Sequence, residues 1–201
     1  MKIRVLVATA LLVLCTGAFA ADEPQKKEMP PDQKAAIDAM MKAMVPGDAH
    51  KLLDGMAGTW DAKITMWMDP SQPPSVSSGT SENSWVMGNR ELAQKFTGTF
   101  MGMPFTGLGY TGYDNIKKQY WGTWVDNFST GVMVSTGSTA DNGKTWKFTS
   151  TSPDPMTGKD SPVEEKVTVT DKDHHTMEMW GAAPDGKMFK MMEIVYTRHK
   201  G

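Results

Sequence analysis

The sequence predicts an all-β fold, an up-and-down antiparallel β-barrel of about ten strands that follows short N-terminal helices. Two observations carry this prediction. Short runs with a period of two follow one another from Gly58 onward, and turn-forming clusters such as Gly88-Asn89 and Asp185-Gly186 separate them. A meander of about ten strands is more than an open, twisted sheet comfortably carries, and closure also removes the exposed edges. We therefore expect a barrel domain over residues 58–200.

The N-terminal end has the pattern of a secretory signal peptide, residues 1–20. Lys2 and Arg4 precede a short apolar run, and small residues ending at Ala20 follow it. We expect export to the periplasm or the exterior after cleavage behind Ala20, and no later stretch is long and apolar enough to span a membrane. Cys15 is the only cysteine and leaves with this peptide, so no disulfide and no cysteine metal site are expected. Lipidation at Cys15 is the alternative, which Leu14 before it disfavours.

The composition restricts the class of partner. Without residues 1–20 the chain has 19 basic and 23 acidic residues, a net charge of −4, and it has no basic run. This balance argues against binding to nucleic acid. The remaining 181 residues suit one domain with its own core. The oligomeric state is not predicted, because periodicity alone does not separate an exposed apolar face from the lining of a barrel.

Two kinds of segment are expected between the signal peptide and the barrel. Residues 21–31 are charged and rich in proline, which predicts a disordered leader. Residues 32–57 predict helices, the first capped by Asp32 and the second carrying Leu53 on a buried face. We expect the second helix to plug one end of the barrel. The first has an apolar stripe that is expected to pack on another part of the protein, formed by Ile37, Met40, Met41 and Met44.

The strands are expected where the period of two is clear. Their ranges are 58–68, 80–87, 91–101, 105–113, 119–126, 131–137, 145–150, 163–170, 175–181 and 187–199. A solvated loop is expected over 69–78. Several glycines lie inside these runs, where glycine is expected to mark a bulge or a bend: Gly98, Gly102, Gly107, Gly109, Gly112 and Gly122. In the first strand one face should be apolar, with Trp60, Ala62, Ile64, Met66 and Met68.

Five segments in order resemble a bacterial family known as domain of unknown function 1579. They are His50-Lys51-Leu52-Leu53, Gly58-Thr59-Trp60, Gly109-Tyr110-Thr111-Gly112-Tyr113-Asp114, Tyr120-Trp121-Gly122-Thr123-Trp124 and Met191-Met192-Glu193-Ile194-Val195-Tyr196-Thr197-Arg198. The second is similar to the Gly-x-Trp motif that opens the first strand in lipocalins and the wider calycin superfamily. The resemblance implies a calycin-like barrel that closes at Gly58, Trp60 and Arg198, with the guanidinium of Arg198 stacked on the indole. The family brings no established activity.

The expected function is non-catalytic binding of a small hydrophobic or amphipathic ligand inside the barrel. A barrel of this size has room for side chains alone or for one small ligand, and aromatic and methionine residues recur on its expected inner faces. Glu193 shares a face with Met191 and Val195, so we expect it to point inward, where a carboxyl needs a partner or a raised pKa. A fully packed, purely structural interior is the alternative. The candidate ligand-binding residues are Tyr113, Trp124, His175, Met177 and Glu193.

Metal or haem binding is a second hypothesis, although no cofactor is expected. Met177 and Met179 share a face with His175, and soft thioethers with an imidazole suit Cu(I) in an exported protein. Core packing is the simpler explanation of the 18 methionines, and reversible oxidation is a third. The related haem-binding nitrobindin-like barrels hold iron through a histidine, for which this sequence shows no counterpart.

An enzyme acting on a small ligand inside the barrel is the third hypothesis. The chain has no Gly-x-Ser-x-Gly, no phosphate loop and no His-Glu-x-x-His, so no catalytic residue is assigned and catalysis is not expected. A catalytic barrel would need a polar cluster inside it, for which Glu193 with Tyr113 or His175 is the candidate.

Overall fold

The computed structural model describes residues 30–154, 157–183 and 186–200. The predicted signal peptide and nearly all of the predicted leader lie outside these residues. The described chain divides into two units between Asp38 and Ala39, and the second unit contains everything after that point. The first helix, α1 (Pro31–Ala43), begins with a proline, whose fixed φ suits the first helical position.

The apolar stripe of α1 is exposed, which corrects the expectation that it packs on another part of the protein. No residue of α1 is buried, and Met40, Met41 and Met44 are each more than half exposed. The spacing of apolar residues identified the stripe, but periodicity says nothing about what covers it.

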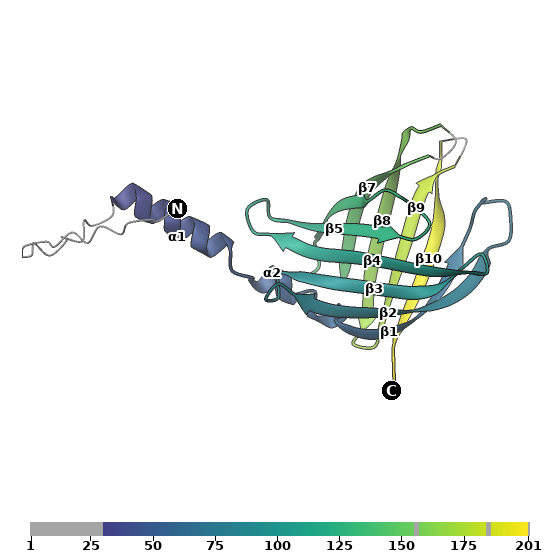
Figure 1. Ribbon diagram of the computed structural model, residues 1–201, viewed down its shortest axis with the longest axis horizontal. Helices are drawn as coiled ribbons and strands as arrows, with labels where there is room; N and C mark the ends of the chain where they lie inside the picture. Colours follow the sequence, from purple (N-terminus) through teal and green to yellow (C-terminus); the bar gives the residue numbers. More distant parts are fainter. Residues whose placement is uncertain (1–29, 155–156, 184–185, 201) are drawn as a thin grey trace, which may run out of the picture. The chain divides into compact units, whose positions relative to one another are not determined.

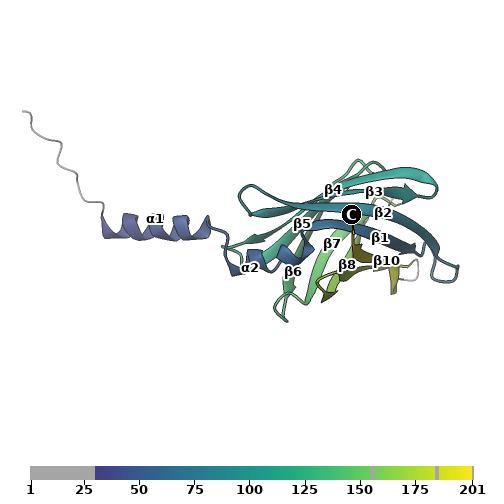
Figure 2. The same cartoon turned by 90° about the horizontal axis from the view of Figure 1, so that it is seen from below.

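A short helical segment plugs one end of the barrel (Figure 2). It consists of α2 (Asp48–Lys51) and a single 3-10 turn, η1 (Asp54–Met56). Between them Leu53 is only 1% exposed. Side chains from the barrel wall fasten this segment, because the Tyr120 hydroxyl donates to the Ala49 carbonyl at 2.8 Å and the Trp85 indole donates to the Asp54 carboxylate at 2.9 Å. We call residues 48–57 the plug.

Ten strands follow the plug and close into an antiparallel barrel, which confirms the predicted fold (Figure 1). They are β1 (Gly58–Met66), β2 (Ser75–Val86), β3 (Glu91–Phe100), β4 (Met103–Asp114), β5 (Gln119–Asp126), β6 (Met133–Thr139), β7 (Thr145–Pro153), β8 (Asp160–Asp171), β9 (His174–Ala182) and β10 (Met188–Arg198). Each strand pairs with its neighbours in the chain, and β1 also pairs with β10 over seven residues, from Trp60↔Arg198 to Met66↔Met192. In Figure 1, β2 to β4 run across the view and β8 to β10 cross them steeply.

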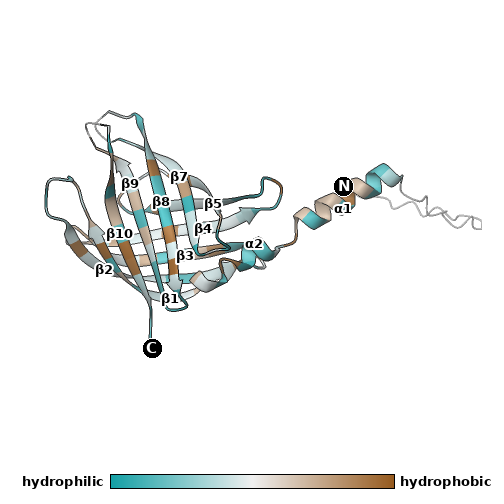
Figure 3. Cartoon of the chain, turned by 180° about the vertical axis from the view of Figure 1, so that it is seen from behind, coloured by the Kyte–Doolittle hydropathy of each residue, from teal (hydrophilic) through white to brown (hydrophobic). Residues whose placement is uncertain are grey.

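The ends of several strands differ from the sequence prediction, and two of these differences concern β1 and β2. β2 begins at Ser75, inside the stretch predicted as a loop, because polar residues there complete the backbone ladder with β1. Met68 lies beyond the end of β1 and is 73% exposed, so the predicted inner face of this strand stops at Met66. Hydrophobic and hydrophilic residues alternate along some of the barrel strands, for example β8 (Figure 3).

The glycines of β4 make room for rings and do not mark bulges. A side chain at Gly107 or Gly109 would collide with the indole of Trp124 on the neighbouring strand. The ladders that β4 forms with β3 and β5 run without a shift in register. The irregularities lie elsewhere, between Lys190 and Met192 on β10 and between Val169 and Asp171 on β8.

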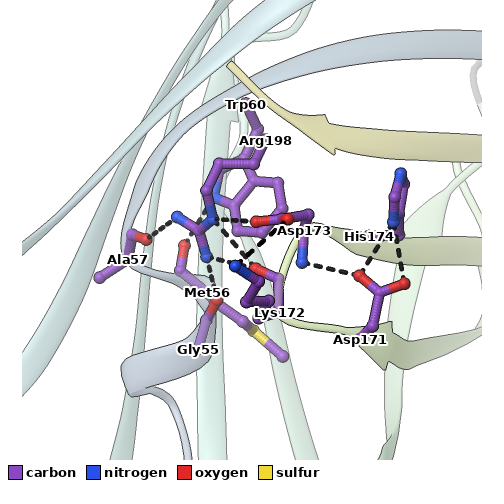
Figure 4. A network of polar contacts seen from close by, with 9 residues as sticks. All are labelled: Gly55, Met56, Ala57, Trp60, Asp171, Lys172, Asp173, His174 and Arg198. Atoms are coloured by element: carbon purple, nitrogen blue, oxygen red, sulfur yellow. Dashed lines mark hydrogen bonds and ion pairs between the residues drawn. The ribbon is translucent and has the colours of Figure 1, made fainter. Parts of the chain in front are cut away.

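The guanidinium of Arg198 joins β10 to β1, to the plug and to the β8–β9 turn (Figure 4). Its carbon lies 4.1 Å from the centroid of the Trp60 ring, which is only 1% exposed. Its nitrogens donate to the carbonyl oxygens of Ala57 at 3.0 Å, Gly55 at 3.1 Å and Lys172 at 2.8 and 3.0 Å. This is the closure contact that the resemblance implied.

Two further features complete the closure. The Trp60 indole donates to the Met56 carbonyl at 2.9 Å, which ties β1 back to the plug. Gly58 has φ +115°, a value that side chains disfavour, and a Cβ there would lie 2.7 Å from Nη1 of Arg198. Glycine at this position therefore lets the guanidinium approach the backbone.

Replacing Arg198 with lysine should destabilise the fold although the charge is kept. Lysine cannot stack as a planar group or reach three carbonyls at once, so we expect a loss of roughly 2–4 kcal/mol in the free energy of unfolding. Urea denaturation measures this loss. Arg90→Lys is the matched control, because Arg90 is exposed and binds turn carbonyls away from the closure. Equal losses in the two variants would contradict the role given to Arg198.

Candidate functional site

A cavity of about 490 Å³ lies inside the barrel, and every strand contributes at least one residue to its wall. Two groups of buried residues flank it. The plug cluster lies against the plug and consists of Leu53, Leu92, Tyr120, Trp146, Phe148 and Val167. The closure cluster lies beside Arg198 and consists of Trp60, Ala62, Ile64, Phe96, Ile194 and Tyr196. Met177 packs against both clusters and also lines the cavity.

Aromatic rings form one side of the cavity. Phe105 is parallel to Trp124 at 6.5 Å between ring centroids and to Phe128 at 5.8 Å. Phe96 meets the edge of Phe105 at 5.9 Å, and Phe100 meets Phe128 at 5.0 Å. Because these five rings contact one another, they give a broad apolar surface to any molecule inside.

Methionine is the other main component of the wall. Thioether side chains lining the cavity come from the plug and from four strands: Met56, Met66, Met133, Met177, Met179 and Met192. Methionine side chains are unbranched and polarizable, so they adapt their shape to what they contact. A wall of this kind can accommodate a molecule without a rigid match of shape.

Glu165 is the group in the cavity that sequence reasoning missed. It lies on β8, and the accessible part of its side chain faces the cavity. No hydrogen bond or ion pair to it is present within residues 30–154, 157–183 and 186–200. Burial raises the pKa of its carboxyl from 4.5 to about 7. The signal was present in the sequence, because Val163 and Val167 alternate with Glu165 on one face of a strand and both are buried.

Tyr196 and Gln94 accompany Glu165. Burial is the main cause that raises the pKa of the Tyr196 hydroxyl. Interaction with Gln94 lowers this pKa, and the charge of Glu165 raises it further. The Gln94 amide donates to the Ser81 hydroxyl at 2.8 Å, and that hydroxyl bonds the Asn83 amide oxygen at 2.8 Å. Gln94 is thus held in place by hydrogen bonds within the barrel, whereas no described residue bonds the carboxyl of Glu165.

His175 connects the closure to the cavity. Its ring is parallel to Tyr196 at 4.4 Å and meets the Trp60 ring edge-on at 4.3 Å. Burial lowers the pKa of His175 to about 4, and the nearby charge of Arg198 acts in the same direction. The imidazole is therefore neutral at physiological pH.

The charged side chains in the cavity wall are carboxylates only. Besides Glu165, the wall contains the carboxylate of Asp126, which accepts hydrogen bonds from the Trp124 indole at 3.0 Å and from the Phe128 backbone N–H at 2.9 Å. Among the described residues that line the cavity there is no lysine and no arginine. Two carboxyl groups and a neutral histidine therefore set the electrostatics of the interior.

The structure brings together three of the five predicted ligand-binding residues. Trp124, His175 and Met177 line the cavity. Tyr113 does not, because its ring packs against His50 and Tyr120 near the plug.

Glu193 lies on the outer face of the barrel, so the expectation that it points inward was wrong. Its carboxylate pairs with Lys190, which also binds Glu178 at 3.2 Å. The inward residues of this part of β10 are Met192, Ile194 and Tyr196. The sequence misled because residues on both faces of β10 are apolar, so the alternation did not identify the buried face.

In the described part of the chain no group of three or more His, Cys, Asp or Glu side chains is placed to hold a metal ion. The soft ligands proposed from the sequence, His175 with Met177 and Met179, do share the cavity wall. No helix in the described ranges combines the length and apolar character needed to cross a membrane.

Comparison with known proteins identifies a family and a fold. Residues 45–198 match the family described as protein of unknown function (DUF1579). No curated protein matches the chain. The crystal structure of Rv2717c from M. tuberculosis is similar, with a TM-score of 0.56 and 15% sequence identity over 78% of this chain and 100% of that chain. A redesigned β-barrel is matched with a TM-score of 0.39 and 17% identity over 76% of this chain and 96% of that one.

At 15% identity, the likeness to Rv2717c concerns the fold alone. The family match is broader evidence, because it extends from the loop before the plug to the closing arginine. It confirms the family that the ordered segments resemble. The chain belongs to the family of proteins of unknown function DUF1579, and its fold is a closed ten-stranded antiparallel barrel.

Proposed function

We propose that this protein is exported and binds one small, largely apolar molecule inside its barrel without transforming it. The observation that carries the proposal is the cavity of about 490 Å³ that remains after all ten strands have contributed side chains. Ligand-binding cavities in proteins typically measure roughly 300–1,000 Å³ and are lined mainly by apolar groups. The signal-peptide pattern of residues 1–20 supports export.

A barrel with a purely structural role would not be expected to keep a cavity of this size. Protein interiors are close-packed, and a void forfeits the dispersion contacts that its lining atoms would otherwise make. Thirteen hydrophobic residues of the described part of the chain, including Trp60, Trp146 and Phe148, are already buried in the barrel and its plug. The remaining space is therefore more economically explained as room for a ligand than as a fault in packing.

The unpartnered carboxyl of Glu165 supports binding of an amphipathic molecule. A buried carboxyl without a partner destabilises the folded state, and valine or leucine at this position would pack better. Groups that lower stability in this way are characteristic of functional sites. Catalysis finds less support, because a pKa lowered to about 4 makes His175 a weak general base and its ring contacts are with Trp60 and Tyr196.

Filling the centre of the cavity should abolish binding of apolar molecules. Met177→Trp places a large ring between the two core clusters, and we expect it to weaken binding of the neutral dye Nile red by about tenfold or more. Thr176→Trp adds the same ring at the next position of β9, which does not line the cavity, and should change affinity by less than about twofold. Dye fluorescence measures both. Equal affinity of wild type and Met177→Trp would place the dye outside the barrel.

The raised pKa of Glu165 should make stability depend on pH. The folded protein holds a proton on Glu165 up to about pH 7, whereas the unfolded chain loses it near 4.5, so this group contributes a fall in stability between these values. Glu165→Gln removes that fall. From pH 5 to pH 8 we expect the free energy of unfolding of the variant to rise by roughly 2–3 kcal/mol relative to wild type.

Urea denaturation at the two pH values tests this expectation. The comparison with wild type matters, because His175 contributes in the opposite direction: its lowered pKa removes stability as the pH falls from 6.5 towards 4. Glu164→Gln makes the same substitution on the exposed outer face of β8 and is the control. A difference between Glu165→Gln and wild type that does not change with pH would show that Glu165 is solvated.

A further inference from the structure

We propose that the ligand is an organic cation, an apolar molecule with a single ammonium group whose nitrogen binds the carboxylate of Glu165. This inference rests on the proposed function and adds the chemical class of the molecule. It follows from the charges inside the barrel, from the Glu165 carboxyl that no described residue bonds, and from the aromatic rings that line the same cavity.

The charges of the wall favour a cation. Glu165 and Asp126 are acidic, His175 is neutral, and no lysine or arginine is among the described residues that line the cavity. A fatty acid or another carboxylate would place a second negative charge beside Glu165 with no cation to compensate it. A cation of the same size would instead be attracted, and the low dielectric of the interior strengthens that attraction.

Glu165 is the carboxyl available to such a ligand. Asp126 already accepts two hydrogen bonds from the protein, whereas no described residue bonds to Glu165. A carboxylate has room for about four hydrogen bonds, and an ammonium group supplies three donors. The charge of Glu165 acts on the Tyr196 hydroxyl, and both side chains line the cavity, so a second polar group is available there.

The rest of the wall suits the apolar part of such a molecule. The rings of Phe96, Phe105 and Trp124 and the thioethers of Met177 and Met192 line the same cavity as the carboxyl. Aromatic faces attract cations as well as hydrocarbon, so they do not oppose the entry of a charged group. Glu165 is the carboxyl of this wall that no described residue bonds, so an ammonium group that binds it would fix the orientation of the molecule.

Three probes of equal chain length test the proposal: decylamine, decanol and decanoate. They share the hydrocarbon and differ in charge. At pH 8 we expect decylamine to bind at least about tenfold more tightly than decanol, and decanoate to bind more weakly than decanol. Isothermal titration calorimetry measures the affinities, and the fluorescence of Trp124 and Trp146, which line the cavity, reports where the probes bind.

Two variants assign the preference to one carboxyl. Glu165→Gln should lower the affinity for decylamine by about tenfold or more and leave decanol within about twofold, which also shows that the variant is folded and its cavity intact. Glu164→Gln, on the outer face of the same strand, should keep the preference of wild type. Retention of the amine preference in Glu165→Gln would overturn the assignment.

The affinity of wild type for decylamine should also rise from pH 6 to pH 8. In this range Glu165 loses its proton, whereas His175 on β9 is neutral throughout and Tyr196 on β10 stays protonated. Asp126 on β5 is the other titratable group of the wall. Decylamine remains a cation in this range, so the rise reports the protein.

The possible failures are distinguishable. If decanol binds and decylamine binds no more tightly, the inference about charge is wrong and the proposed function stands. If none of the three probes binds to wild type, the proposed function itself is wrong.

Discussion

The structure depends on one contact, the guanidinium of Arg198 on the indole of Trp60. It joins the last strand to the first, and its hydrogen bonds to Gly55 and Ala57 hold the plug against the same seam. Without closure, β1 and β10 would be exposed edges and the inner faces would have no common interior. The contact also reaches the cavity, because Trp60 touches His175, which is parallel to Tyr196. Barrel closure and the shape of the cavity are therefore parts of one arrangement.

The interior combines two opposing requirements. The barrel needs enough buried aromatic and aliphatic surface to be stable, and a ligand needs space that this surface does not fill. The two core clusters meet the first requirement at the plug and at the closure, and the cavity of about 490 Å³ lies among the flexible methionines and rings between them. Glu165 lowers stability, and in the proposed function it is the feature that would give the cavity a chemical preference. Its position supports the proposed binding of a small molecule over a purely structural interior.

The sequence was sufficient for the fold, because period-two alternation and turn residues located all ten strands and Trp60 and Arg198 indicated where they close. It was less reliable inside the barrel. On β10 both faces are apolar, so Glu193 was assigned inward although its partner is Lys190 on the outer surface. On β8 the alternation of Val163, Glu165 and Val167 did indicate an inward carboxyl, although Glu165 was not among the predicted site residues. Whether a cavity remains depends on how side chains from ten strands pack together, and no local pattern records that.

The ionisation of Glu165 can be followed directly through the ¹³C chemical shift of its carboxyl carbon in the ligand-free protein. A midpoint near pH 7 is expected for a carboxyl enclosed by the barrel without a partner, and decylamine should lower it as the ammonium group pairs with the carboxylate. A midpoint near the ordinary value of 4.5, unchanged by decylamine, would show that the group is solvated or already paired. That result would contradict a cavity built to receive a cation.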